Sequence, residues 1–169
     1  MEPFYEYSKP LGGRALFEIV LEQLGLVVSS AGIREQKARL AAEIIREARN
    51  YRWVGIYDVL ESEIAVVGWT GELPAFPRYP RTEGLSGEAV RTGAVVVAND
   101  IRHDSRYLTT FGTTQSEVII PVCNSRSQVV GTVDVESDRL NAFAEEDVRF
   151  LKQCASALEP LFAICAKLA

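Results

Sequence analysis

Cysteine is scarce in this sequence, which contains three: Cys123, Cys154 and Cys165. No two of them have the C-x-x-C spacing of metal-binding or redox-active pairs, and their scattered positions are typical of reduced thiols in a protein core. Histidine occurs once, as His103, which excludes a metal centre built from several histidines. The sequence therefore predicts no metal site and no cofactor.

Long basic runs and long apolar runs are also missing. The 18 Lys and Arg residues are outnumbered by 23 Asp and Glu residues, for a net charge of −5, whereas nucleic-acid binding requires a clustered basic surface. The first residues, MEPFYEYSKP, lack the basic start and apolar stretch of a signal peptide. No apolar run is long enough to span a bilayer. We expect a cytoplasmic protein with no nucleic-acid partner and no membrane association.

The length of 169 residues and the 47% hydrophobic content are typical of one globular domain with its own core. Apolar residues recur at helical spacing over residues 16–27 and again over 34–49, where Asn50 is a plausible helix stop. A third helical pattern opens with the acidic stretch NAFAEED. Pro160 interrupts this pattern and should end or kink the helix.

Between these helices the apolar pattern changes to a period of two, which indicates strands. YRWVGIYDVL and EIAVVGWT indicate a hairpin, AVVVAND a compact strand, and SEVIIPV with QVVGTVDVES a second strand pair. GELPAFPRYPRTEG, with three prolines, favours an ordered loop with a short edge strand at most. Residues 85–91 indicate a short helix ended by Gly93. Helices at both ends with strands between them predict one α+β layered domain.

Because strand side chains alternate between faces, parity predicts which residues meet. Trp53 and Tyr57 share one face of the first strand, and Val54 and Ile56 share the other. In the later strand pair, apolar residues alternate with the acidic residues Glu117, Asp134 and Glu136. The sheet is predicted to have one apolar face against the helices and one face of aromatic rings and carboxylates.

The acidic face needs an explanation, because buried carboxylates without partners are destabilising and raise one another's pKa. A face open to water would satisfy them, as is common in antiparallel sheets. Trp53 and Tyr57, however, are large rings that prefer to be covered, and the segments on either side of AVVVAND are long enough to cover them. This favours a covered pocket, since binding sites combine aromatic walls with a few polar groups.

The segments EGLSGEAVRTGAVVVANDIRHDSRYL, SEVIIPV and VVGTVDVESDRLNAFAEEDVRFLKQCA resemble a GAF domain in order and spacing. The resemblance implies a central antiparallel sheet of about six strands, with the N- and C-terminal helices on one face and a loop-covered ligand pocket on the other. It implies a single domain, 1–169, made of an N-terminal helix or extension (1–33), a GAF core (34–157) and the end of the C-terminal helix (158–169).

Within that family, WVGIY with SEVIIP and DVES is similar to the stand-alone free methionine-(R)-sulfoxide reductases. This similarity implies that an aromatic pair and acidic residues hold the ligand, beneath a lid of loops. A face with several carboxylates suits a small molecule that carries an ammonium group. The predicted ligand-binding residues are Trp53, Tyr57, Trp69, Ser86, Thr110, Glu117, Asp134 and Glu136.

The resemblance fails at the cysteines on which those reductases depend. The turn that carries one of them is GLSG here, with Ser86, a second falls at Thr110, and a third falls within 75–77, which reads AFP. Reduction of a sulfoxide by this route requires a thiolate that attacks sulfur and a second thiol that resolves the product. A serine hydroxyl ionises poorly and has no disulfide chemistry. We therefore predict no sulfoxide reductase activity and no catalytic residue.

Other chemistry has weaker signals. Ser86 lacks the G-x-S-x-G elbow of hydrolases, and His103 lies in a polar loop where a solvated side chain is expected. DVESD lacks the glycine and the spacing of an EF-hand loop. Cyclic-nucleotide binding, which is known for other GAF domains, would require cations for the phosphate, and these could come from Arg78, Arg81 and Arg106.

The sequence thus predicts a stand-alone GAF domain with a sensory or regulatory role, which binds a small molecule without converting it. Two alternatives stay open: a divergent free methionine-(R)-sulfoxide reductase with relocated thiols, and a dimeric interaction module whose pocket is vestigial. Both terminal helices are long and apolar, and no second domain is expected to cover them. This favours a homodimer formed through the terminal helices.

Overall fold

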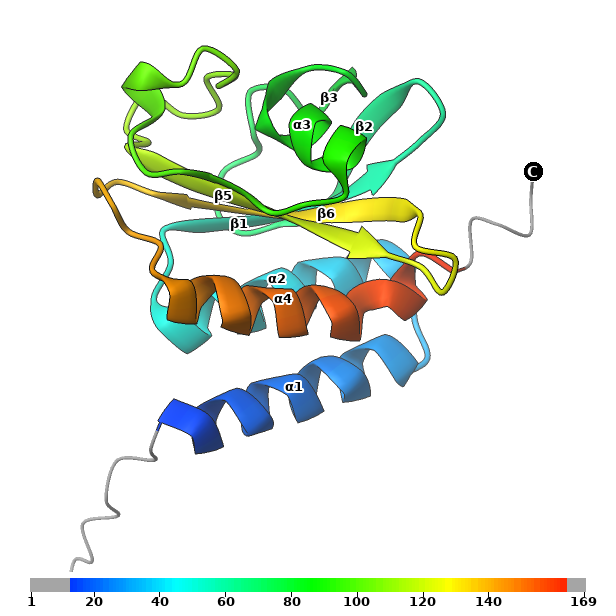
Figure 1. The fold of residues 1–169 in the computed structure, drawn as a ribbon. Helices are drawn as coiled ribbons and strands as arrows, with labels where there is room; N and C mark the ends of the chain where they lie inside the picture. Colours follow the sequence, from blue (N-terminus) through cyan, green and yellow to red (C-terminus); the bar gives the residue numbers. More distant parts are fainter. Residues whose placement is uncertain (1–12, 164–169) are drawn as a thin grey trace, which may run out of the picture.

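The computed structural model describes residues 13–163, in which a six-stranded sheet lies between helical layers (Figure 1). The order across the sheet is β3-β2-β1-β6-β5-β4, and all neighbouring strands are antiparallel. The predicted α+β fold with about six antiparallel strands is confirmed. The strands are β1 (Trp53–Val59), β2 (Glu63–Trp69), β3 (Arg78–Pro80), β4 (Val96–Ala98), β5 (Ser116–Cys123) and β6 (Val129–Ser137).

Helices form two layers on one side of the sheet. α2 (Arg34–Arg49) and α4 (Glu145–Leu158) pack on the strands, whereas α1 (Gly13–Ser29) packs mainly on α2 and α4 and forms an outer layer (Figure 1). The helices at both ends of the chain are therefore on one side, as predicted, but α1 is not in the layer next to the sheet. On the opposite side, α3 (Gly84–Thr92) covers the strands.

The helix ends follow local signals in the sequence. α2 ends at Arg49 because Asn50 takes the left-handed conformation, with φ of 53° and ψ of 43°. α4 ends at Leu158, and the chain continues through Pro160 as a 3-10 turn, η2 (Glu159–Leu161). A second 3-10 turn, η1 (Ile101–His103), follows β4. The stops predicted at Asn50 and Pro160 are confirmed.

The main core lies between the sheet and α2 and α4. Alternate residues of the central strands, such as Val54, Ile56 and Val133, are buried against these helices, as parity predicted. The third predicted helix is buried in the same core at Leu151, Ala155 and Leu158, and Phe162 follows it into this core. Within residues 13–163, no helix is long and apolar enough to cross a membrane.

Candidate functional site

The face of the sheet opposite α2 and α4 carries the polar residues that the sequence singled out. β1 contributes Trp53 and Tyr57, β5 contributes Glu117, and β6 contributes Asp134 and Glu136. α3 and the long segment after β4 lie over these strands (Figure 1). Strand alternation thus gathers rings and carboxylates on one covered face.

The three carboxylates form one cluster. In the antiparallel register Glu117 pairs directly with Glu136, and Asp134 precedes Glu136 by two residues on the same face of β6. One oxygen from each residue lies within 4.8 Å of the oxygens chosen from the other two. The exposed fractions of Glu117, Asp134 and Glu136 are 5%, 4% and 0%. Like charges this close in a dry environment repel one another strongly unless protons or cations neutralise them.

Burial raises the pKa of all three carboxyl groups above the usual range. Repulsion from Asp134 and Glu136 raises the pKa of Glu117 further, and repulsion from Glu136 does the same for Asp134. A hydrogen bond between Glu117 and Asp134 raises the pKa of Glu117 and lowers that of Asp134. Burial and mutual repulsion therefore favour a proton shared by this pair in the unliganded pocket.

The protein itself satisfies the cluster only in part. Thr114 Oγ1 donates a hydrogen bond to Glu136 Oε2, and Arg52 Nη1 lies 3.9 Å from the same oxygen. Asp134 Oδ1 and Glu136 Oε1 are buried without a hydrogen-bond partner in the described chain. Such orphaned acceptors are rare in native proteins. An ammonium group would satisfy them, and the oxygen spacing would also suit a hard metal cation.

Aromatic rings form a wall beside the carboxylates. The ring centroids of Trp53 and Tyr57 lie 6.5 Å apart, and those of Tyr57 and Tyr79 lie 6.0 Å apart. Gly55 makes this packing possible, because a Cβ at this position would lie 2.3 Å from Trp53 Cη2 and 2.8 Å from Tyr57 Cε2. Phe111 extends the wall, with its centroid 5.4 Å from that of Trp53. The faces of such rings attract cations.

A small cavity lies next to the carboxylates. Its volume is about 20 Å³, which is room for about one water molecule. A larger ligand can enter only if the segments that cover the cavity move outward. The lining residues are Tyr57, Phe76, Tyr79, Gly84, Leu85, Ser86, Leu108, Thr110, Glu117 and Asp134.

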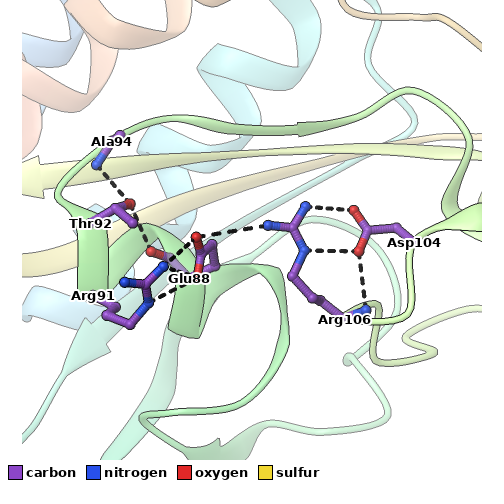
Figure 2. Close-up of polar contacts among 6 residues, drawn as sticks. All are labelled: Glu88, Arg91, Thr92, Ala94, Asp104 and Arg106. Carbon is purple, nitrogen blue, oxygen red and sulfur yellow. Dashed lines mark hydrogen bonds and ion pairs between the residues drawn. The ribbon is translucent and has the colours of Figure 1, made fainter.

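Ion pairs tie one covering segment to α3. Arg106, in the loop that also contains Thr110, pairs with Asp104 at 2.7 Å and with Glu88 of α3 at 4.0 Å (Figure 2). Glu88 also pairs with Arg91, one turn further along α3, at 2.7 Å. The Arg106 side chain is 44% exposed, and exposed ion pairs contribute only about 0–1 kcal/mol. The loop is thus held to α3 by a weak link that can open.

The predicted ligand-binding residues do not all line one cavity. Glu136 belongs to the carboxylate cluster but does not line the cavity, and Trp53 lines a separate cleft of about 390 Å³. Trp69 lines neither, and the guanidinium carbon of Arg39 lies 5.8 Å from its ring centroid. Trp69 packs against the cluster formed by Trp53, Tyr57 and Ile64. The cavity itself is lined by Tyr57, Ser86, Thr110, Glu117 and Asp134.

Sequence reasoning missed Tyr79, Phe111 and Arg52. Tyr79 lies on the three-residue strand β3, inside the proline-rich segment, and its hydroxyl is hydrogen-bonded to Ser86. Phe111 and Arg52 lie outside the strands, so parity says nothing of where they point. Tyr79 could have been found only by predicting that an edge strand pairs with β2, and the prolines of this segment make such a strand hard to recognise.

Neither described cysteine lies at the cavity. Cys154 is buried in the core between α4 and the sheet, where burial raises the pKa of its thiol to about 12. Cys123 is exposed at the end of β5 and lines a groove with Lys152 of α4. The pairing of β5 with β6 is irregular between Val122 and Cys123. Cys165 lies outside the described residues.

Comparison with known families identifies the architecture. The family model of the GAF domain matches residues 34–161. The chain belongs to the GAF domain family. The match begins at Arg34, the first residue of α2, so α1 precedes the part that the GAF family model describes.

This GAF domain is similar to both GAF domain proteins and reductases. It is 29% identical over 147 residues to GAF domain-containing protein A of Dictyostelium discoideum, and the matched region covers 85% of this chain and 90% of that protein. It is 27% identical to the free methionine-R-sulfoxide reductase of Escherichia coli, over 75% of each chain. The structure of the free methionine-R-sulfoxide reductase from Neisseria meningitidis, in complex with its substrate, matches with a TM-score of 0.81 and 25% identity over 100% of both chains.

Replacing Glu117 with glutamine is expected to stabilise the unliganded GAF domain at neutral pH. The folded state holds the Glu117 proton more tightly than the unfolded state does. The wild-type free energy of unfolding therefore falls as the pH rises from the ordinary glutamate pKa of about 4.3 toward the raised folded-state pKa. The glutamine variant avoids this loss, and its melting temperature should rise by about 2–4 °C for each kcal/mol gained.

Thermal unfolding between about pH 5 and about pH 8 measures this difference. Glu61→Gln, in the exposed turn between β1 and β2, is the control and should follow the wild type. A difference between Glu117→Gln and the wild type that stays constant with pH would contradict the buried-carboxyl explanation.

Truncating Arg106 to alanine is expected to raise the amide hydrogen exchange of residues 104–111 by up to about fivefold, because it removes a link worth about 0–1 kcal/mol. Arg91→Ala is the matched control, since it takes an arginine from the same Glu88 without releasing the loop. Equal exchange of the loop in the two variants would mean that Arg106 does not hold it.

Proposed function

We propose that this GAF domain is a sensory domain that binds a small molecule with a positively charged amino group and does not convert it. One observation carries the proposal. Glu117, Asp134 and Glu136 are buried with oxygens within 4.8 Å of one another, and two of their oxygens lack hydrogen-bond partners in the described chain. An ammonium group brings a full positive charge and three N–H donors, which matches this set of acceptors.

A purely structural role for the cluster is disfavoured by its energetics. Ionised carboxylates buried without partners are strongly destabilising, and well-packed apolar residues in their place are often more stable. Stability given up in this way is typical of binding sites, where polar groups are held ready for a ligand. The cluster is therefore best explained by a ligand that it receives.

The lining of the cavity favours an organic amine over a bare metal ion. Tyr57 and Tyr79 stand beside the carboxylates, and the apolar side chains of Phe76, Leu85 and Leu108 close the other sides. A hydrated metal ion would gain nothing from these apolar groups. An amine with an apolar portion would bury that portion against them and place its ammonium group at the carboxylates.

Relatives support an amino acid or a related amine as the ligand. One relative is named a free methionine-R-sulfoxide reductase, and another reductase of that name was solved with its substrate. The resemblance to these reductases aligns two of their cysteines with Ser86 and Thr110, which bring hydroxyl groups to the cavity here. Hydroxyl groups cannot form the disulfide that sulfoxide reduction requires. Binding without reduction follows from this substitution.

A divergent reductase is the second candidate, and the same relatives favour it. Such an enzyme would need a thiol from elsewhere, and Cys123 is the exposed one of the described cysteines. An NADPH-coupled assay with thioredoxin and free methionine-(R)-sulfoxide separates the two candidates. Turnover that disappears in Cys123→Ser would replace the non-catalytic proposal with the reductase.

Ligand binding is expected to raise the melting temperature of the wild-type protein. L-methionine, its (R)-sulfoxide and n-butylamine are suitable probes, and a ligand at about 100 times its Kd adds about 2.7 kcal/mol to the free energy of unfolding. That gain corresponds to a rise of several degrees, at about 2–4 °C per kcal/mol. Asp134→Asn should abolish the rise, because it removes one of the charges that the ammonium group meets.

N-acetylmethionine is the matched control, because acetylation removes the positive charge and leaves the side chain unchanged. It should give no rise in melting temperature. A rise with the acetylated compound as large as with methionine would contradict recognition of the amino group. No rise with any probe would favour the interaction module with a vestigial pocket.

We also propose that the protein is a homodimer formed through the helical side of the molecule, where α1 is the outer layer. Ile19 and Leu26 of α1 and Leu40 of α2 are exposed by 38%, 65% and 52%, and exposed apolar side chains mark a protein–protein interface where they form a contiguous patch. Leu26→Glu is expected to convert the dimer into a monomer in analytical ultracentrifugation. Leu73→Glu, at a leucine that is 52% exposed in the loop before β3, is the control. A monomeric wild type would refute the dimer.

A further inference from the structure

Arg52 is a charged residue at the carboxylate cluster for which the proposed function gives no role. It immediately precedes β1, its side chain is 29% exposed, and its guanidinium carbon lies 4.9 Å from the centroid of the Phe111 ring. Its Nη1 atom lies 3.9 Å from Glu136 Oε2 and is buried without a hydrogen-bond partner in the described chain. Arg52 therefore acts on the cluster through its charge more than through hydrogen bonds.

A neighbouring arginine shows that this arrangement is particular to Arg52. Arg46 lines the same outer cleft as Arg52, but it donates a hydrogen bond to Glu43 at 3.0 Å. Arg52 has no such surface partner among residues 13–163, and its ion pair is with Glu136. The positive charge of Arg52 is thus directed at the cluster, while that of Arg46 is already balanced at the surface.

The other groups that act on the cluster are neutral or negative. Tyr57 of β1, Tyr79 of β3 and Tyr107 of the covering loop have pKa values raised by burial, so their hydroxyls stay neutral. Asp104 adds repulsion toward Glu117. Among the groups of the described chain that act on these carboxylates, Arg52 supplies the positive charge.

We propose that Arg52 is a built-in counter-ion that makes the pocket favour ligands with one positive charge over ligands with two. This inference rests on the proposed function and narrows its ligand class. Three ionised carboxylates require three positive charges. Arg52 neutralises Glu136, a proton shared by Glu117 and Asp134 neutralises a second carboxylate, and one ligand ammonium group neutralises the third.

Removal of Arg52 should change the charge that the pocket prefers. n-Butylamine and 1,4-diaminobutane share a carbon chain and differ by one ammonium group, so the ratio of their Kd values isolates the effect of charge. In Arg52→Gln, isothermal titration calorimetry should find the preference for the diamine over the monoamine raised by at least about tenfold, because the cluster has lost one positive charge. Arg52→Lys keeps the charge and should stay near the wild-type ratio.

Arg46→Gln is the matched control, since it removes an arginine from the same cleft without touching the cluster. Its ratio should equal that of the wild type. An unchanged ratio in Arg52→Gln, or an equal change in Arg46→Gln, would overturn the role of Arg52 while leaving amine binding intact.

A ligand-free measurement separates this inference from the proposed function. If the wild type binds neither amine, the proposed function fails. In that case ¹³C NMR of the side-chain carboxyl groups still tests whether Arg52 is the counter-ion of Glu136. Loss of a nearby cation raises the pKa of a carboxyl group, so Glu136 should titrate at higher pH in Arg52→Gln than in the wild type or Arg46→Gln. A Glu136 midpoint that does not move would refute the counter-ion.

Discussion

Negative charge buried in the sheet is the constraint on which the rest of the pocket depends. Glu117 and Glu136 face each other across β5 and β6, and Asp134 lies beside them. Protonation, the Thr114 hydroxyl and the Arg52 guanidinium each relieve part of the repulsion. The aromatic wall and the covering loop keep most water out. The lower dielectric constant strengthens the electrostatic interactions inside the pocket. The pocket thus attracts cations strongly, although its cavity is small.

The opposite face of the same strands explains how the protein stays folded despite the cost of burying these carboxylates. Val133 and Val135 alternate with the acidic residues of β6 and lie in a continuous apolar core with α2 and α4. Apolar burial contributes roughly 25 cal/mol per Å², and this core includes residues of four central strands and three helices. The free energy gained by packing this apolar core therefore offsets the cost of burying the carboxylates on the other side of the sheet.

Much of this could be predicted from the sequence because strand alternation and helix periodicity depend only on local geometry. Trp53, Tyr57 and the acidic residues were placed on one face by parity alone, and Asn50 marked the end of α2. Parity gives a face but no distance across the sheet. Trp69 accordingly pairs with Gly55 on β1 and packs against Trp53 and Tyr57, yet it does not line the cavity.

The residues that were not predicted lie in segments without the regular periodicity of a helix or a long strand. Tyr79 comes from a three-residue edge strand, and Phe111 and Arg52 come from connecting segments whose direction depends on tertiary packing. The small volume of the cavity also depends on how Leu108 and Phe76 settle over it, which is a property of loops. The sequence could therefore identify the floor of the site better than its lid.

β6 has one further mechanical property. Its backbone is shared by Asp134 and Glu136, which face the pocket, and by Val133 and Val135, which support the helical layer. Only a single thickness of peptide separates the two sides. A displacement of the Asp134 and Glu136 side chains would act on the same backbone that carries Val133 and Val135 against α2 and α4.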